Sequence, residues 1–410
     1  MDHLRIPLRR RVGPCARTAP SPARALTCRA MRRFASFADI DYVERKDVAR
    51  MEAGTIREDR ERQVEDIQKM NAQQNARLSI APMMDWTDRH CRFFHRMLSR
   101  HTVLYTEMVT APALVRGGAL HLLRHDPVEH PLVLQLGGSD PLELAQAARL
   151  GWEAGYGEIN LNCGCPSDRV QSGSFGAILM TEPDRVARIC AAMRAASPAR
   201  ITVKCRIGVD DQDPERALPQ FLDRLVQAGV AHVIIHARKA WLQGLSPREN
   251  REIPPLDHDL VLAMKTAFPG LRITLNGGIT TLDQARAVLD RGLDGVMIGR
   301  AAYQRPGDIL LAADRDIYGQ PGQRSVRGAL DAMRPYIAAE LAGGVRLTSI
   351  TRHMLGLFAG APGARHWRRI LSEQAHRPGA GLEVLDRALD AVHAAHEMRA
   401  TEGDMHAVSP

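Results

Sequence analysis

The chain has 410 residues, enough for one large domain, a smaller one and a sizeable apolar core. Hydrophobic content of 45% and charged content of 25% are typical of a soluble globular protein, and no apolar run reaches the roughly 18 residues of a membrane helix. The seven cysteines are scattered and odd in number, which argues against a disulfide framework and predicts a reducing, cytoplasmic location.

The net charge of +8 comes from the N-terminal segment. Residues 1–38 hold nine Arg and one acidic residue, whereas the rest of the chain has 46 basic and 46 acidic residues. The net charge alone therefore predicts no nucleic-acid partner. Any prediction of such a partner must rest on local clusters of basic residues. We interpret residues 1–77 as an Arg-rich, disordered extension and a charged linker. A transit peptide and an over-extended start codon stay open as alternatives for its first part.

Short apolar runs that end in polar residues recur from residue 78 onward. They are LSIAPM (78–83), VLYTEM (103–108), LVLQLGG (132–138), EINLNCG (158–164), ITVKCRI (201–207), HVIIHAR (232–238), ITLNGGI (273–279) and GVMIGR (295–300). Helix-like stretches fill the intervals, and those at 140–155 and 281–292 have a capping residue first and glycine last. Eight strands that alternate with helices predict a closed parallel (β/α)₈ TIM barrel over residues 78–323. A doubly wound sheet is the alternative, but no G-x-G-x-x-G follows the first run.

The alternation of strands and helices stops after residue 323. Residues 324–400 indicate helices at 326–344, 347–360 and 364–375, followed by a last Ala-rich segment. The predicted fold is therefore an α/β barrel followed by a smaller, all-helical C-terminal domain.

Polar residues mark nearly every predicted strand end, which is where the active site of this barrel lies. They are Asp85, Glu107, Gln135, Asn160, Asn162, Cys165, Lys204, Arg206, His236, Arg238, Asn276 and Arg300. Any one of them could be an ordinary strand-end polar group, but so many in phase predict a functional site. In EINLNCGCPSD (158–168), Glu158, Asn160 and Asn162 alternate with apolar residues, which predicts a polar face directed into the barrel.

The last two predicted strands end in glycines. Glycine lets backbone N–H groups approach an anion closely, and the loops after strands seven and eight form the common phosphate site of this barrel. Gly277, Gly278, Gly299 and Arg300 are therefore predicted to surround a phosphate-bearing ligand, with simple turn glycines as the alternative. For Lys204 the sequence leaves open a salt bridge, a Schiff-base lysine and a cation that stabilises developing negative charge.

Several ordered motifs closely resemble those of the tRNA-dihydrouridine synthases. They are APMMDWTDRHCR, LYTEMV, LQLGGSDP, EINLNCGCPSDRVQSGSFGA, KCRIGVDD, HARKAWLQGLSPRENREIPPL and LNGGI, and the stretches HARKAWLQGLSP and RHMLGLFAGAPGARHWRR are similar to subfamily A in particular. The resemblance runs from about residue 78 to 377. It implies an FMN-dependent barrel with a helical tRNA-binding domain that uses NADPH. The reaction so implied reduces the C5=C6 bond of uridine in the tRNA D-loop, at positions 20 and 20a for subfamily A.

The resemblance also implies roles for matching residues. The catalytic acid would be Cys165, and the flavin contacts would be Pro82, Met83, Met84, Gln135, Lys204, His236, Asn276, Gly277, Gly278, Gly299 and Arg300. The tRNA contacts would be Asn162, Arg248, Arg251, Arg365 and Arg368. No metal is predicted, because Cys163 and Cys165 lack C-x-x-C spacing and have no second pair.

The chemistry agrees with these roles. Reducing the uracil C5=C6 bond needs a hydride, which reduced flavin supplies, and a proton, which a thiol still protonated at neutral pH can give. Cys163 is assigned the inert role of a small buried hydrophobe. Residues 346–377 carry six Arg and one acid, and Arg365, Arg368 and Arg369 share a helix face at i, i+3 and i+4. This face is predicted to bind RNA, with a solvated helix face as the alternative.

Two other functional classes stay open at this stage. One is an FMN barrel oxidoreductase for a small substrate, although such an enzyme needs no basic helical domain. The other is an RNA-binding protein with a vestigial barrel, against which the intact set of Cys165, Lys204 and His236 argues. The sequence predicts no membrane and no protein partner.

Overall fold

The computed structural model describes residues 76–167, 175–320 and 324–407. All of them belong to one compact unit that begins at Arg62. The predicted extension and linker, residues 1–77, lie outside the described residues except for the last two positions. None of the described helices is long and apolar enough to cross a membrane.

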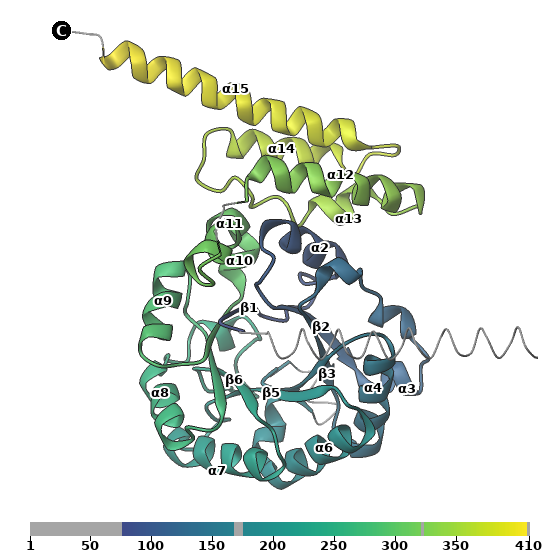
Figure 1. Ribbon diagram of the computed structural model, residues 1–410, viewed down its shortest axis with the longest axis vertical. Coiled ribbons are helices and arrows are strands. Elements are labelled where there is room, and N and C mark those ends of the chain that lie inside the picture. Colours follow the sequence, from purple (N-terminus) through teal and green to yellow (C-terminus); the bar gives the residue numbers. More distant parts are fainter. Residues whose placement is uncertain (1–75, 168–174, 321–323, 408–410) are drawn as a thin grey trace, which may run out of the picture. The chain divides into compact units, whose positions relative to one another are not determined.

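Eight parallel strands form the sheet of this unit (Figure 1). They are β1 (Leu78–Ile80), β2 (Leu104–Thr110), β3 (Leu132–Gly137), β4 (Glu158–Cys163), β5 (Arg200–Arg206), β6 (His232–His236), β7 (Arg272–Asn276) and β8 (Gly295–Ile298). Their order is β1-β8-β7-β6-β5-β4-β3-β2, and a parallel bridge between Ser79 and Val103 joins β1 to the residue before β2. The Ile80 N–H donates to Val103 O at 2.9 Å across this seam. The sheet is therefore closed, and the prediction of a (β/α)₈ barrel with these eight strands is confirmed.

Helices connect successive strands and surround the sheet in Figure 1. The α-helices are α2 (Arg89–Leu98), α3 (Ala111–Val115), α4 (Pro141–Glu153), α6 (Pro183–Ala196), α7 (Pro214–Gln227), α8 (His258–Ala267), α9 (Leu282–Asp290), α10 (Arg300–Gln304), α11 (Pro306–Asp316), α12 (Val326–Ala342), α13 (Leu347–Thr351), α14 (Ala364–Gln374) and α15 (Leu382–Ala407). Short 3₁₀ helices are η1 (Leu120–Leu123), η2 (Pro127–Glu129), η3 (Gly176–Thr181) and η4 (Glu249–Arg251).

The two helices predicted most clearly begin at capping side chains. Asp140 Oδ1 accepts hydrogen bonds from the N–H groups of Leu142 and Glu143, at 2.8 and 2.9 Å, at the start of α4. Thr281 Oγ1 accepts from the Gln284 N–H at 3.2 Å at the start of α9. These contacts satisfy N–H groups that have no partner within the helix, so the local sequence alone marks where each helix begins.

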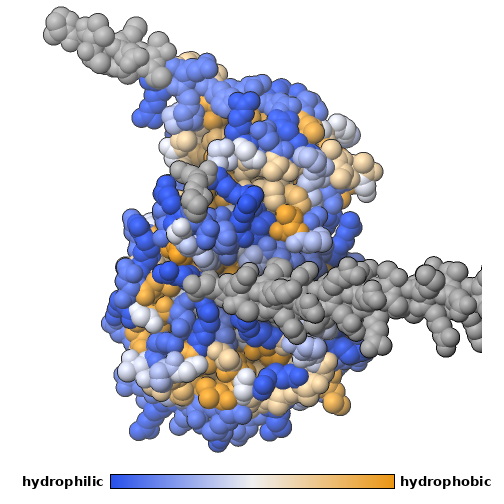
Figure 2. Space-filling model, in the orientation of Figure 1, coloured by the Kyte–Doolittle hydropathy of each residue, from blue (hydrophilic) through white to orange (hydrophobic). Residues whose placement is uncertain are grey.

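Strand alternation divides the core into two layers. Ile159 and Leu161 of β4 face outward and join the large apolar cluster between the sheet and the helices. A smaller cluster, which includes Tyr105, Ile234 and Met297, fills part of the barrel interior. The outer face seen in Figure 2 is mostly hydrophilic, with apolar patches between the charged side chains. The barrel is therefore packed on both sides of its sheet, as this fold requires.

The C-terminal helices match the prediction except in one segment. Helices α12, α14 and α15 form where expected, but α13 ends at Thr351, so the predicted helix at 347–360 is wrong beyond that residue. Met354 O accepts hydrogen bonds from the Leu357 N–H at 3.0 Å and from Trp367 Nε1 at 2.9 Å. Contacts with distant residues thus set the backbone here, against the local preference for helix. The division into two domains at residue 323 stays a prediction.

Candidate active site at the carboxyl ends of the strands

The polar face of β4 points into the barrel, as predicted. Asn162 Nδ2 donates to Gln135 Oε1 of β3 at 2.9 Å, and Asn160 Nδ2 donates to Thr202 Oγ1 of β5 at 3.0 Å. Gln135 is only 1% exposed, and its Nε2 donates to Asn160 Oδ1 at 2.9 Å. Each of these two contacts uses one hydrogen-bonding position of the Gln135 amide. A ligand can therefore bond only to the remaining lone pair of Oε1 or the remaining N–H of Nε2.

Cys165 lies on the turn after β4 and is partly exposed, whereas Cys163 is fully buried in the outer core. Asn162 Oδ1 accepts hydrogen bonds from the N–H groups of Gly164 and Cys165, each at 3.0 Å. On the other side, Nε of the buried Arg206 donates to Gly164 O at 2.9 Å. Side chains of two adjacent strands thus hold the turn that presents the thiol.

Lys204 and His236, on β5 and β6, lie in a strongly cationic environment. Burial, reinforced by Arg206, lowers the pKa of Lys204 to about 8. Burial, followed by the charges of Arg206 and Lys204, holds the pKa of His236 well below its usual range. Near pH 7 Lys204 is therefore mostly protonated and His236 is neutral. Lys204 is partly buried and has no ion pair among the described residues, and such a cation next to a neutral imidazole favours an anionic ligand.

The glycines after β7 bring the backbone against neighbouring side chains. Gly277 has φ +109°, and a Cβ built on it would lie 2.7 Å from His236 Cδ2. A Cβ on Gly278 would lie 2.5 Å from Leu256 Cδ1. Any larger residue at either position would displace its neighbour, and the predicted role of these glycines at a phosphate stays a prediction.

The ends of β7 and β8 are joined, and the loop after β8 lies beside the loop after β1. Asn276 Nδ2 donates to Met297 O at 2.8 Å, which leaves its Oδ1 as a possible acceptor. A Cβ on Gly299 would lie 3.7 Å from Met83 Sδ. Gly299 directly precedes Arg300, the first residue of α10. The residues predicted to hold a phosphate thus come from two adjacent strand ends.

Four arginines surround one acid beside this strand-end cluster. Glu252 pairs with Arg300 and lies 3.6 Å from Arg248 Nε. Burial, followed by Arg300, lowers the pKa of Arg251. Arg238 donates to a backbone carbonyl, and its Nε is buried with no hydrogen-bond partner among the described residues. A buried guanidinium N–H without a partner costs free energy, which an anionic group would recover.

The loop after β1 is a compact turn with one exposed apolar side chain. The Met83 N–H donates to Thr87 Oγ1 at 2.9 Å, and Thr87 Oγ1 donates to Met83 O at 3.1 Å. Pro82 and Met83 are partly buried, while Met84 is 56% exposed. The predicted flavin-lining residues therefore share one fixed loop, from which Met84 extends toward solvent.

This loop is connected to the C-terminal helical segment through residues that the sequence did not reveal. Trp86 stacks on Tyr303 with ring centroids 4.3 Å apart, and the Tyr303 hydroxyl lies 3.1 Å from His353 Nδ1. His353 Nε2 lies 3.0 Å from a carboxylate oxygen of Asp88, which also pairs with Arg352. Although burial raises the pKa of Asp88, the His353 and Arg352 contacts and a backbone N–H hold it well below its usual range. Asp88 is therefore ionised at neutral pH and joins the helical segment to the barrel.

The predicted tRNA-binding arginines fall on two separate elements. Arg365, Arg368 and Arg369 are exposed on α14, opposite the buried Trp367, and within the described chain these three form no ion pair. Arg248 and Arg251 lie at η4, beside the barrel mouth, and no described contact joins them to α14. Asn162, also predicted to contact tRNA, is 8% exposed with both ends of its amide engaged.

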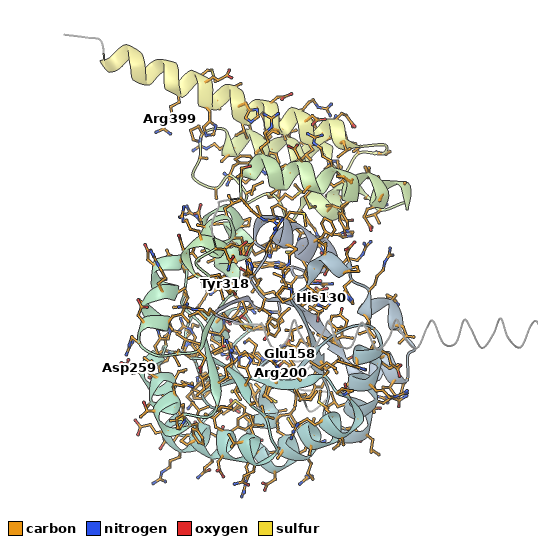
Figure 3. All side chains as sticks on the ribbon, in the orientation of Figure 1. His130, Glu158, Arg200, Asp259, Tyr318 and Arg399 are labelled. Carbon is orange, nitrogen blue, oxygen red and sulfur yellow. The ribbon has the colours of Figure 1, made fainter. Side chains whose placement is uncertain are left out.

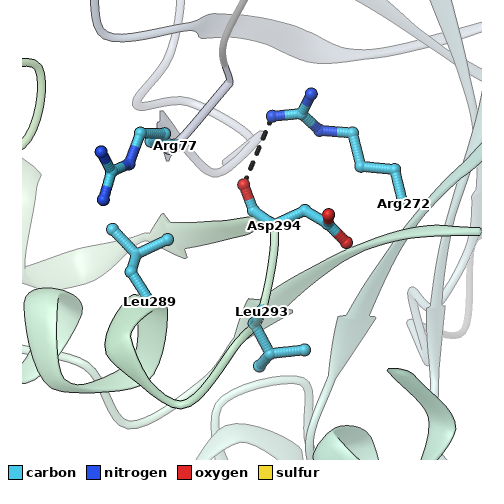
Figure 4. A pocket seen from close by; sticks show the side chains of 5 residues that line it. All are labelled: Arg77, Arg272, Leu289, Leu293 and Asp294. Carbon is cyan, nitrogen blue, oxygen red and sulfur yellow. Dashed lines mark hydrogen bonds between the residues drawn. The ribbon is translucent and has the colours of Figure 1, made fainter. Parts of the chain in front are cut away.

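A separate cavity lies at the opposite end of the barrel. It has a volume of about 260 Å³ and is lined by Arg77, Arg272, Leu289, Leu293 and Asp294, at the amino ends of β1, β7 and β8 (Figure 4). Active sites of this fold lie at the carboxyl ends of the strands, so this cavity is not the candidate active site. Within the ranges that the structure describes, no three His, Cys, Asp or Glu residues are grouped to hold a metal ion.

Comparison with known proteins decides the family. The model of the dihydrouridine synthase (Dus) family matches residues 79–394. The chain belongs to this family. It is 56% identical over 314 residues to the tRNA-dihydrouridine(20/20a) synthase of Xanthomonas axonopodis pv. citri, covering 77% of this chain and 93% of that protein. It is 55% identical to the synthase of the same name from Vibrio cholerae, covering 77% and 96% of the two chains. The synthase of Escherichia coli K12 is 54% identical, with 79% and 94% covered.

Family membership confirms the predicted resemblance and supports the predicted class, a flavin-dependent oxidoreductase. One solved structure, an old yellow enzyme homologue from Zymomonas mobilis, aligns with a TM-score of 0.44 and 12% identity over 62% of this chain and 92% of that one. At that level it supports no statement about this protein. The residues that prediction missed are Trp86, Asp88, Tyr303 and His353, whose contacts join distant segments. Only the aspartate left a sequence signal, as a cap before α2.

Proposed function

We propose that this chain reduces uridine to 5,6-dihydrouridine in the D-loop of tRNA, at positions 20 and 20a. The observation that carries the proposal is the partly exposed Cys165 thiol, fixed at the barrel mouth beside Lys204 and Arg206. It occurs in a chain more than half identical to proteins named for this product. A cytoplasmic location remains a prediction.

We further propose FMN as the cofactor and NADPH as its reductant. The residues present fit an anionic cofactor, because Arg238 Nε is buried without a partner and the surrounding cations outnumber the acids. Gly277 and Gly278 lack side chains and have positive φ, so their backbone N–H groups could approach a phosphate closely. Asn276, Gly299 and Arg300 would complete the phosphate site, while Pro82, Met83, Met84, Gln135, Lys204 and His236 would lie along the ring and chain of the flavin. A reduced flavin supplies the hydride that C6 of uracil receives.

Residues of the protein would donate the proton and stabilise the thiolate that remains. In the proposed reaction Cys165 gives its proton to C5 as C6 receives the hydride, so the C5=C6 double bond becomes a single bond, two C–H bonds form, and the S–H bond breaks to leave a thiolate. Lys204, Arg206 and Arg251 are close enough to the thiol to stabilise that thiolate. The thiolate then takes a proton from solvent. Asn162 would keep the thiol directed at C5 through its bonds to the Gly164 and Cys165 N–H groups.

Binding of tRNA would use both sets of arginines. A uridine in folded tRNA must be turned out to reach a barrel mouth, so phosphate contacts are needed around that mouth. Arg248 and Arg251 lie there, and the exposed face of Arg365, Arg368 and Arg369, which form no ion pair with the described residues, would hold a more distant part of the RNA. Because phosphate contacts release counterions, affinity should fall steeply with salt.

The test compares two neighbouring cysteines. The Cys165→Ala variant should retain flavin and bind tRNA normally but form at least about a hundredfold less dihydrouridine, since general acid catalysis contributes about that much or more. The matched control is Cys163→Ala, which removes a fully buried thiol from the outer core and should keep activity at some cost in stability. Normal dihydrouridine formation by Cys165→Ala would refute the proposed acid. A wild-type protein that purifies without flavin and leaves unmodified tRNA unchanged would refute the function.

A further inference from the structure

Five polar side chains form one continuous chain of hydrogen bonds through the barrel interior. Asn162 donates to Gln135, Gln135 to Asn160, and Asn160 to Thr202, at 2.9, 2.9 and 3.0 Å. Thr202 Oγ1 then donates to Glu158 Oε1 at 3.1 Å. Every member is at most 8% exposed. The chain thus runs from the first residue of β4 to the turn that carries the candidate catalytic thiol.

The two ends of this chain demand the same hydrogen-bond direction. At the mouth, the N–H groups of Gly164 and Cys165 can only donate, so Asn162 must present its oxygen to them and its Nδ2 to Gln135. At the far end, burial raises the pKa of Glu158, while Arg200 and Thr202 oppose that rise. In its ionised form Glu158 can only accept, so Thr202 donates to it and accepts from Asn160. The two amides between them, Gln135 and Asn160, then have only one possible orientation. A network fixed from both ends holds a single arrangement.

The carboxylate at the far end is itself held in place. Glu158 is 3% exposed, and Arg200 Nη1 lies 3.7 Å from its Oε2. Figure 3 shows the two side chains next to one another inside the ring of helices. The ring of His232, on β6, approaches Glu158 Oε1 to 3.9 Å. Burying a carboxylate costs free energy unless it is paired, so a buried Glu at this position needs an explanation beyond packing.

From this geometry we propose that Glu158 is a positioning residue for Cys165, acting through Thr202 and the three amides. The acceptor at the far end reinforces the direction that the two N–H groups of the turn already impose on Asn162, so this side chain is held from both ends. Without that acceptor, Asn162 would be held from the mouth alone, and the turn would be fixed less firmly. The thiol would then sample positions away from C5. This inference rests on the function proposed above for Cys165.

The decisive variant is Thr202→Val, which keeps the side-chain volume nearly unchanged but removes both hydrogen bonds of the hydroxyl. Thr202→Ser restores a hydroxyl and should rescue. Thr274→Val is the matched control. Thr274 is also a buried threonine in the barrel interior, but its hydroxyl bonds to His232 and to none of the five side chains of the hydrogen-bond chain. Glu158→Gln is a second test, since an amide can donate as well as accept and so no longer fixes the direction from the far end.

Two measurements on the flavin-loaded protein separate positioning from mere stability. The first is the rate at which iodoacetamide alkylates Cys165, followed on its own peptide by mass spectrometry. The second is the kcat and KM for dihydrouridine formation on unmodified tRNA. We expect Thr202→Val and Glu158→Gln to change the alkylation rate several-fold and to lower kcat roughly ten- to a hundredfold with little change in KM. Thr202→Ser and Thr274→Val should resemble the wild type, even if Thr274→Val melts at a lower temperature.

The outcomes are distinguishable. Wild-type alkylation and kcat in both Thr202→Val and Glu158→Gln would overturn the inference, as would equal losses in Thr274→Val. If Thr202→Val does not fold, Glu158→Gln and Thr202→Ser decide alone. If the wild-type protein forms no dihydrouridine, the proposed function fails, while the alkylation rates still show whether Glu158 controls the position of the thiol.

Discussion

The close contact between Gly277 and His236 gives a sharp prediction for Gly277→Ala. A φ of +109° costs a residue with a side chain about 1–3 kcal/mol. The new Cβ would also lie 2.7 Å from His236 Cδ2, where two carbon atoms normally keep about 3.5–4.0 Å. The imidazole must therefore move by about 1 Å, within a site where it is only 9% exposed. Overpacking of this kind costs a further 1–3 kcal/mol or so.

Gly292→Ala is the matched control. Gly292 has φ +99°, but nothing lies within 4 Å of a Cβ built on it. It therefore carries the backbone strain without the collision, and the difference between the two variants isolates the displacement of His236. We expect both variants to melt below the wild type and Gly277→Ala to melt several degrees lower than Gly292→Ala.

Flavin binding is the assay that connects this contact to the site. We expect Gly277→Ala to bind flavin on the order of ten- to a hundredfold more weakly in fluorescence titrations of the flavin-free protein, because the ring and the phosphate site are displaced together. Gly292→Ala should bind as the wild type does. Equal melting temperatures and equal flavin affinities in the two variants would show that the loop relaxes freely and that the reasoning is wrong.

Two further predictions concern the helical segment. Replacing Arg365 and Arg368 together by Ala should weaken tRNA binding about tenfold at moderate salt and reduce its salt dependence, with flavin content unchanged, as gel-shift titrations at several salt concentrations would measure. Asp88→Asn should keep the helix cap, because Asn caps as well as Asp, but lose the charge that faces Arg352 and His353. A lowered carboxyl pKa stabilises the fold fully above the ordinary value near 4, and this stabilisation is lost only as the pH falls on through the folded-state pKa. The melting temperatures of wild type and variant should therefore differ by a constant amount from about pH 5 to 7, and the difference should begin to shrink below about pH 4.

Both predictions have controls on the barrel's outer helices. Arg286 and Arg291 are exposed arginines of the α9 region that pair with acids, so their double Ala variant removes the same charge and should leave tRNA affinity unchanged. Asp308→Asn removes an exposed carboxylate that pairs with Arg305 and should change the melting temperature little at any pH. Equal effects of target and control variants would mean that only net charge matters.

The sequence predicts the barrel well because its signals are local. Each strand is a short apolar run that ends in a polar residue, and caps such as Asp140 and Thr281 mark helix starts without help from distant residues. The segment after Thr351 fails for the opposite reason. Its backbone is set by Trp367, which bonds to Met354 O, and by Gly356, which packs against Gln304 O. Neither contact leaves a periodic signal in the sequence.

In the candidate site, too, the features with local sequence signals could be predicted, and those that depend on distant residues could not. Strand ends could be located from the sequence, so Cys165, Lys204 and His236 could be placed at the mouth together. What could not be foreseen is which polar groups satisfy one another. Gln135 was expected to face a flavin, yet it is 1% exposed and bonded to two asparagines. Such pairing depends on the register between strands, which a single sequence does not contain.

That register also explains why only one of two neighbouring cysteines is a candidate catalyst. Side chains of a strand alternate strictly between faces, so the inward direction of Asn160 and Asn162 forces Cys163 outward, into the core behind the sheet. Cys165 does not follow this alternation, because β4 ends at Cys163. A slip of one residue in the pairing of β4 would place Ile159 and Leu161 inside the barrel and expose the asparagines to the apolar layer. The register of β4 therefore determines both the buried hydrogen-bond chain and the position of the thiol. A variant that disturbs this hydrogen-bond chain should change the reactivity of Cys165 more than it lowers the melting temperature.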